Sequence, residues 1–177
     1  MAPTNDWSRT WKLVRLKGLD SQLTSFNFKL LHGLLVTRAR MNQINPASST
    51  TCSHCNGQAH EDLQHALLQC SYNDGAGQSL LNAVQTQVVG HITPQCLLRL
   101  EFGTLQEEQE LAVVTLISAC LMEVWMKRAN RIRIRLYEIQ ATLEARCLLL
   151  RETRFAASYQ PLYEMLRQFY YYLNFEI

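Results

Sequence analysis

Four potential metal ligands at short spacing constrain the fold of this chain more than any other feature. They follow the pattern Cys-x2-Cys-x9-His-x4-Cys and are Cys52, Cys55, His65 and Cys70. Zinc binds thiolate and imidazole ligands in a tetrahedron, and a Cys-x2-Cys turn places two thiolates on one side of the ion. We therefore expect these residues to hold one zinc ion. Four protein ligands leave no coordination position open, so the predicted zinc is structural and clamps a loop and a short helix onto the helical body.

Two other histidines lie close to the predicted ligands. His54 lies inside the Cys-x2-Cys turn and should point away from the ion, while His60 would need a different path of the loop. The alternative to a zinc site is a set of buried free thiols beside a surface histidine. A second pair of ligands close to the first, in a polar stretch with little else to form a core, favours zinc over that alternative.

The residues around His65 predict a short helix that begins near Glu61. Glu61 and Asp62 would lie in its first turn, where acidic side chains interact favourably with the helix dipole or support a metal ligand. On an α-helix His65 and Cys70 would be about 500° apart, because each residue adds roughly 100°. They cannot share one face of an unbroken helix, so we expect Cys70 just past the helix end.

The sequence before the metal ligands also predicts helix. Apolar residues between Leu13 and Ile44 recur at helical spacing and indicate one or two helices, with Ser21 or Thr24 as a cap. The apolar stripe of this segment consists of Leu23, Phe26, Leu30, Leu34 and Leu35.

After the metal ligands, one helix is expected from Ser79 to about Val89, with Gly90 placed for a C-terminal cap. Pro94 then opens a short apolar segment, Cys96–Leu100.

Glycine and proline are absent between Thr104 and Gln160. This composition predicts one very long helix, or two with a bend, over roughly Leu105–Arg154. The stretch Arg131–Leu136 alternates with the period of a strand, but its helical surroundings favour helix. A last helix is expected from Pro161 to Asn174, with its aromatic residues packed on the others.

The predicted fold is therefore all-α: a single helical domain over residues 1–177, with a long central helix and a zinc-clamped loop-helix submodule at residues 52–70. Six cysteines without a secretory signal are better explained as metal ligands and buried thiols than as disulfides. Cys96, Cys120 and Cys147 lie on apolar stripes and are expected in the core. The longest apolar stretch, Leu111–Val124, is too short to cross a bilayer. We expect an intracellular protein of the nucleus or cytoplasm, without a membrane partner.

Charge is strongly segregated along the chain. Residues 1–43 carry seven Lys/Arg against two Asp/Glu, residues 44–126 carry one against eight, and residues 127–154 carry eight against three. Two basic segments around an acidic one can bind an anionic partner or neutralise the acidic segment of the same molecule. Two basic rows are candidates for phosphate contacts, with aromatic residues Trp7, Trp11 and Tyr137 interleaved for base stacking. The first row is Lys127, Arg128, Arg131 and Arg135, and the second is Arg9, Lys12, Arg15 and Lys17.

These motifs together resemble the zinc-binding region at the C-terminal end of polyproteins of non-long-terminal-repeat retrotransposons, downstream of the reverse transcriptase. The helical part of the resemblance is carried by Phe26, Phe28, Lys29, His32, Leu35, Thr37, Arg40 and Met41. Its metal part is the Cys-x2-Cys pair followed by Glu61-x3-His65-x4-Cys70, and Trp125-x2-Arg128-x-Asn130 is similar to a stretch further along such polyproteins. The resemblance implies a zinc-binding region that helps to hold a nucleic-acid template. It also implies a free-standing copy, either a truncated element or a host gene derived from one.

We accordingly expect a non-catalytic Cys-Cys-His-Cys zinc finger that binds RNA or single-stranded DNA. The alternatives are a zinc-stabilised protein-interaction module and an inactive relic of a retroelement. Enzymatic activity is not expected, because the sequence offers neither an open metal position nor a nucleophile at a recognisable spacing.

Overall fold

The computed structural model describes residues 7–15, 19–56, 58–85, 91–102, 105 and 107–151. These residues form helices and loops without a strand, and an isolated antiparallel bridge pairs Thr51 with His60. The predicted all-α class is confirmed. In chain order the helices are α1 Trp7–Val14, α2 Ser21–Leu31, α3 Arg38–Ile44, the π-helical turn η1 His65–Gln69, the 3-10 turn η2 Ser71–Asn73, α4 Ala76–Gln85, α5 Pro94–Arg99, α6 Glu107–Ala129 and α7 Leu136–Arg151.

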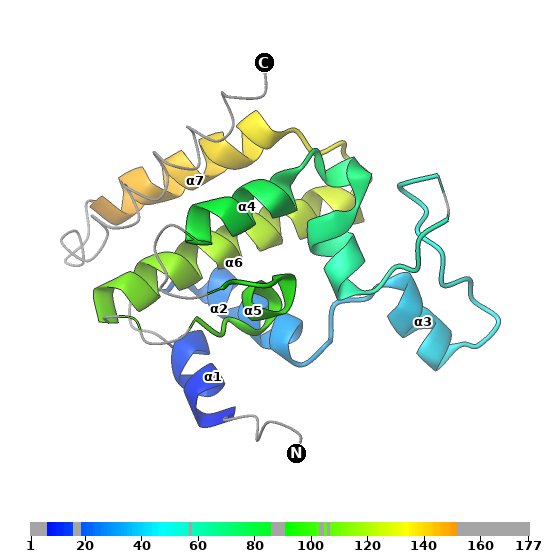
Figure 1. Cartoon of the computed structure of the whole chain (residues 1–177), viewed down its shortest axis with the longest axis horizontal. Coiled ribbons are helices and arrows are strands. Elements are labelled where there is room, and N and C mark those ends of the chain that lie inside the picture. Colours follow the sequence, from blue (N-terminus) through cyan, green and yellow to red (C-terminus); the bar gives the residue numbers. More distant parts are fainter. Residues whose placement is uncertain are drawn as a thin grey trace.

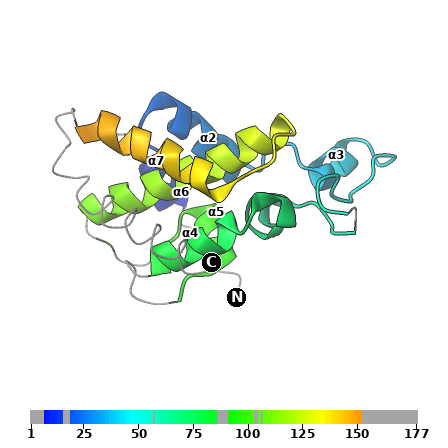
Figure 2. The ribbon, with the colours of Figure 1, turned by 90° about the horizontal axis from the view of Figure 1, so that it is seen from above.

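Helix α6 is the centre of the fold. Every side chain from Leu111 to Leu121 is buried, because this stretch is apolar or small on all sides of the helix. The helices α2, α4, α7 and η1 all pack against it, and Figure 1 shows α4 and α7 running alongside α6. In both views α3 and the loop after it lie at one end of the molecule, away from α7 (Figure 2).

The segment Leu105–Arg154 was predicted to form one very long helix or two helices with a bend. It forms two helices, α6 and α7. However, the helix predicted for Arg131–Leu136 was wrong over its first five residues. Helix α6 ends at Ala129 in a Schellman motif: the amide of Arg131 donates to the carbonyl of Arg128, and that of Ile132 donates to the carbonyl of Lys127. Arg131 has a φ of 57° there. The chain then runs through a loop to α7, with Ile134 completely buried and Ile132 about half exposed.

The first helices differ from the prediction in their caps. Helix α2 is capped by Asp20, whose carboxylate accepts from the amide of Leu23 at 2.8 Å, and not by Ser21 or Thr24. The predicted apolar stripe is otherwise buried, except for Leu34, which follows Gly33 at the helix end and is 47% exposed.

Other predictions fall partly outside the described residues. Helix α4 begins three residues before the predicted Ser79, and the predicted cap at Gly90 and the helix Pro161–Asn174 lie outside the described residues. Cys120 is in the core and Cys96 packs against it, as predicted. The side chain of Cys147 is not described. In the described part of the chain, no helix has the length and apolar character required to cross a membrane.

Candidate metal centre

The loop between α3 and η1 presents the first two cysteines. The amide of Cys52 donates to the carbonyl of Ala59, and the amide of Glu61 donates to the carbonyl of Thr50, both at 2.8 Å. These two bonds, on either side of the Thr51–His60 bridge, close the loop at its base. Inside the turn, the amide of His54 donates to Cys52 Sγ at 3.4 Å. Such N–H···S bonds stabilise a thiolate, so the turn is prepared to bind a cation.

The last two ligands are the first residue of η1 and the residue that follows its end. Asp62 Oδ1 accepts from the amide of His65 at 2.7 Å and so begins the helical segment. The amide of Cys70 donates to the carbonyl of His65 at 2.8 Å, a bond between residues five apart. A π-helical turn is roughly one residue wider than an α-helical turn, so Cys70 lies about one turn beyond His65 instead of on the opposite side. Cys70 is past the helix end, as predicted, but the wide turn that aligns it with His65 was not predicted.

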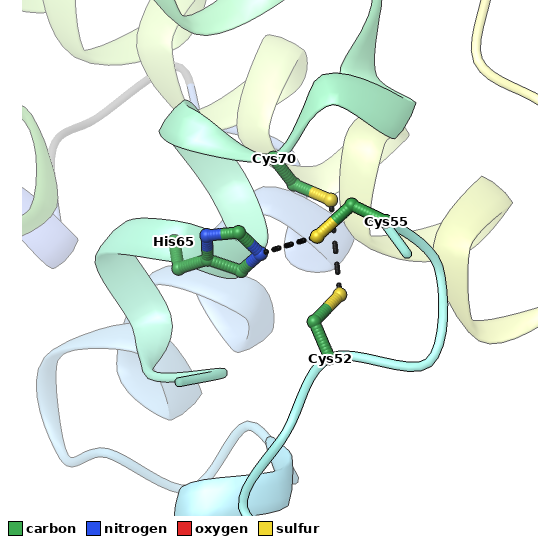
Figure 3. A group of neighbouring side chains, drawn as sticks. All are labelled: Cys52, Cys55, His65 and Cys70. Carbon is green, nitrogen blue, oxygen red and sulfur yellow. Dashed lines mark hydrogen bonds between the residues drawn. The ribbon is translucent and has the colours of Figure 1, made fainter. Parts of the chain in front are cut away.

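The four ligand atoms converge on one point, with all of them within 4.8 Å of one another. Figure 3 shows the arrangement: Cys52 Sγ and Cys70 Sγ are 3.8 Å apart, and Cys55 Sγ is 3.2 Å from His65 Nε2. Two thiolates on a tetrahedral zinc, each about 2.3 Å from the ion, would be about 3.8 Å apart. A disulfide would bring the sulfurs to about 2.05 Å, and these cysteines are free. The donor set and its spacing therefore fit one zinc ion.

The two alternative histidines do not join this group. The His54 ring packs against Tyr72, with the ring centroids 4.8 Å apart, and His60 is exposed beside the base of the loop. The prediction that neither would replace His65 agrees with this geometry, since the four-residue group contains only His65.

The ionisation of the ligands shows why the cluster requires a cation. Burial, and then the neighbouring Cys52 and Cys70 side chains, raises the pKa of the Cys55 thiol to about 12. Burial would also raise the pKa of Cys52, but hydrogen bonds from the amides of His54 and Cys55 and from Arg128 lower it overall. Burial, followed by the charge of Arg128, lowers the pKa of His65 and favours the neutral imidazole that binds zinc. Several thiolates can coexist here once an ion of charge +2 is bound.

A buried arginine from α6 reaches the site from far along the sequence. Arg128 Nη2 donates to Cys52 Sγ at 3.0 Å and to Glu61 Oε2 at 2.8 Å. Arg128 is 3% exposed and Glu61 is 6% exposed. Glu61 also accepts from the amide of Arg38 through Oε1, so it links α3 to the metal loop. Glu61 supports the ligand set, one of the two roles predicted for it, whereas the carboxylate of Asp62 accepts from the amide of His65 at the start of the helical segment.

The first predicted basic row does not form as one surface stripe. Arg128 is buried and paired, which is a correction to its placement among surface phosphate contacts. Lys127 Nζ is bound by Glu138 at 2.9 Å and lies 3.7 Å from Glu123. Arg131 and Arg135 are exposed, but they lie on the loop after α6 because that helix ends before them.

The second predicted basic row is described in part. Lys12 and Arg15 are exposed on and just after α1, and the Arg15 guanidinium lies over the Trp11 ring, 5.8 Å from its centroid. Trp11 itself contacts Phe28 and His32, so it packs α1 onto α2. The side chain of Arg9 and the whole of Lys17 lie outside the description.

Comparison with known protein families agrees with the ligand geometry. Residues 1–76 match the family described as zinc-binding in reverse transcriptase. This match contains all four ligands and confirms the predicted zinc-binding region associated with retrotransposons. Neither a curated protein nor a solved structure matches the chain. The zinc-binding region, as residues 1–76 are called below, holds one structural zinc through Cys52, Cys55, His65 and Cys70.

Removal of single histidines should distinguish the ligand from its neighbours. His65→Ala should lower the zinc content of the purified chain from about one ion to well below half, because three ligands bind zinc much more weakly than four. His54→Ala and His60→Ala should retain the wild-type content, since neither ring is among the converging atoms. Elemental analysis of the dialysed proteins measures this directly. Loss of zinc from the His60 variant but not from the His65 variant would exclude the ligand set.

Proposed function

We propose that the zinc-binding region and the loop that follows α6 form a non-catalytic module that binds RNA or single-stranded DNA. The observation that carries the proposal is a cluster of exposed arginines on that loop, residues 130–135, here called the arginine loop. Arg131, Arg133 and Arg135 are all exposed. A phosphate backbone is attracted to such a cluster because each neutralised phosphate releases a condensed counterion.

The arginine loop lies beside the zinc-binding region. At its far end, the amide of Leu136 donates to Asp74 Oδ2 at 3.3 Å. At its near end, Arg131 lies close enough to His54 for its positive charge to act on that ring. Burial lowers the pKa of His54 most, and the charges of Arg128 and Arg131 lower it further. Figure 1 shows this loop, between α6 and α7, at the end of the bundle where η1 lies. Residues on the two segments are therefore available to one extended ligand.

An exposed aromatic ring adjoins the arginines. Tyr137 is 59% exposed, and its hydroxyl oxygen accepts from Arg135 Nη1 at 3.2 Å. Stacking of unpaired bases on aromatic and guanidinium groups is sequence-tolerant, which suits a single strand better than a duplex. We infer a non-catalytic role because four protein ligands occupy the zinc tetrahedron and leave no position for water or substrate.

The test is the binding of a labelled single strand by the full chain at several salt concentrations. Arg131→Ala combined with Arg135→Ala should weaken binding about tenfold at low salt, and should reduce the slope of log K against log salt by about 1.4 if each arginine neutralises one phosphate. The matched control replaces both arginines with lysine, which keeps the charge and should keep most of the slope. Equal binding by the alanine variant, or binding that does not depend on salt, would refute the proposal.

A second candidate function is favoured by exposed apolar residues in the zinc-binding region. Between residues 28 and 44 five large apolar side chains are exposed: Phe28, Leu34, Val36, Met41 and Ile44. Exposed apolar side chains are typical of protein-binding surfaces when they are contiguous. A protein-interaction module is therefore the alternative if no nucleic acid binds, and an inactive relic is the alternative if neither kind of partner binds.

A further inference from the structure

The contact between Arg128 and Cys52 joins two parts of the chain that sequence comparison separates. Cys52 and Glu61 lie in the zinc-binding region, while Arg128 lies on α6, outside the matched residues 1–76. Arg128 is also the arginine of the Trp125-x2-Arg128-x-Asn130 stretch. A guanidinium that is 3% exposed has been removed from water almost completely, which is costly unless charged partners surround it.

Once zinc is bound, the guanidinium of Arg128 contacts two negatively charged groups, the zinc centre and the Glu61 carboxylate. One zinc ion with three thiolates and a neutral imidazole has a net charge of −1. Glu61 adds a second buried negative charge beside it. The ion pair with Glu61 would by itself neutralise the charge of Arg128. However, Arg128 Nη2 also donates to Sγ of the zinc ligand Cys52 at 3.0 Å. This bond partly compensates the negative charge of the zinc centre and holds the Cys52 side chain in its ligand position.

We infer that Arg128 is a positioning residue of the zinc centre, which compensates the charge of the zinc thiolates and thereby fixes α6 and the arginine loop against the zinc-binding region. The functional zinc unit then extends beyond residue 76 to include the second half of α6. Glu61 is the shared partner: its side chain binds Arg128 and the amide of Arg38, and its carbonyl accepts from the amide of Ala39.

The arginine loop is anchored through the same residue. The carbonyl of Arg128 accepts from the amide of Arg131, near the start of the loop, and the carbonyl of Lys127 accepts from the amide of Ile132. An arginine held at the zinc centre therefore also fixes the direction in which the chain leaves α6. The relevance of this anchoring to nucleic acid rests on the proposed function, but the anchoring itself does not.

The first experiment measures zinc release from the full chain to a chromogenic chelator in excess. Arg128→Met should release zinc at least tenfold faster than the wild type, in the range found when a partner of a metal ligand is removed. Glu61→Gln, which keeps a polar partner for Arg128, should change the rate less. The double variant Arg128→Met with Glu61→Gln is decisive: it should still release zinc fast, because the thiolate remains without its donor.

Two results would overturn the inference. One is an Arg128→Met rate equal to that of the wild type. The other is a double variant with the wild-type rate, because Arg128 would then serve only to neutralise Glu61. If Arg128→Met does not fold, Arg128→Gln decides: it keeps a polar donor but loses the positive charge, so faster release supports the inference and an unchanged rate refutes it.

The second measurement is limited trypsin digestion, which reads the position of the arginine loop without nucleic acid. Cleavage after Arg131, Arg133 and Arg135 should be about tenfold faster in zinc-loaded Arg128→Met than in the wild type, because local opening exposes the loop. Cleavage after Arg99, an exposed residue of α5, is the internal control and should not change. Equal cleavage of the loop in both proteins would refute the anchoring. If the loop is cleaved slowly in the wild type and fast in Arg128→Met, but the wild type binds no nucleic acid, the anchoring stands and only the proposed function is refuted.

Discussion

Cys70→Ser is expected to leave the full chain without bound zinc and to unfold the loop and the turn that the ion holds together. Cys70 is buried, and its sulfur is 3.8 Å from that of Cys52. A serine hydroxyl does not replace a thiolate as a zinc ligand at neutral pH. Structural zinc contributes on the order of 10 kcal/mol to the folding of small zinc fingers, so its loss should exceed the effect of any single surface substitution.

The unfolding should be local, because α6 has a core of its own. Residues Leu111–Leu121 are buried, and α2, α4 and α7 pack against α6 in addition to η1. Hydrogen exchange should therefore lose protection over residues 50–73 while the amides of α6 stay protected. Elemental analysis should find less than a tenth of an ion per chain, an order-of-magnitude expectation for a site without its fourth ligand.

Cys96→Ser is the matched control for this experiment. Cys96 is half-buried at the start of α5, and its sulfur lies 3.2 Å from Thr93 Oγ1, outside the ligand group. The control should keep one zinc and the exchange pattern of the wild type. A Cys70 variant with a full complement of zinc would mean that the remaining three residues bind the ion with a different fourth ligand.

The ligand set was predictable from the sequence, whereas the turn that assembles it was not. Cysteine and histidine spacing identifies zinc ligands directly, because few other arrangements use these residue types together. The five-residue separation of His65 and Cys70 showed only that an α-helix could not present both. A π-helical turn satisfies the same spacing, but no residue type signals it, since it forms under the constraint of the surrounding contacts.

The placement of the basic residues failed for a physical reason that can be named. Helical spacing put Lys127, Arg128, Arg131 and Arg135 on one row, but Schellman motifs usually place glycine where α6 has Arg131. Because no glycine stands at that position, the end of α6 could not be predicted, and the left-handed conformation of Arg131 costs about 1 kcal/mol. Burial of Ile134 offsets that cost. Arg128 was likewise invisible as a zinc partner, because its contacts are 67 and 76 residues away along the chain.

Gly77→Ala should be among the most destabilising substitutions away from the metal ligands. Gly77 is buried in α4, where the helix packs against η1. A Cβ at this position would meet the carbonyl oxygen of Leu68 and come within 2.5 Å of its Cα. These are backbone atoms of the turn between His65 and Cys70, so they cannot move aside without shifting two zinc ligands. Overpacking of this kind typically costs about 1–3 kcal/mol, and we expect the upper end.

Gly33→Ala separates this steric effect from the general cost of replacing glycine. Gly33 ends α2 with a φ of 62°, and a Cβ there would meet nothing within 4 Å. Its replacement should cost only the left-handed strain, about 1 kcal/mol. In chemical unfolding of the zinc-loaded proteins, Gly77→Ala should therefore have a clearly lower free energy of unfolding than Gly33→Ala. Zinc release should be faster than in the wild type only for Gly77→Ala. The reverse ranking would show that α4 and η1 are not in backbone contact, and that the zinc-bearing turn is held by the ion and its loop alone.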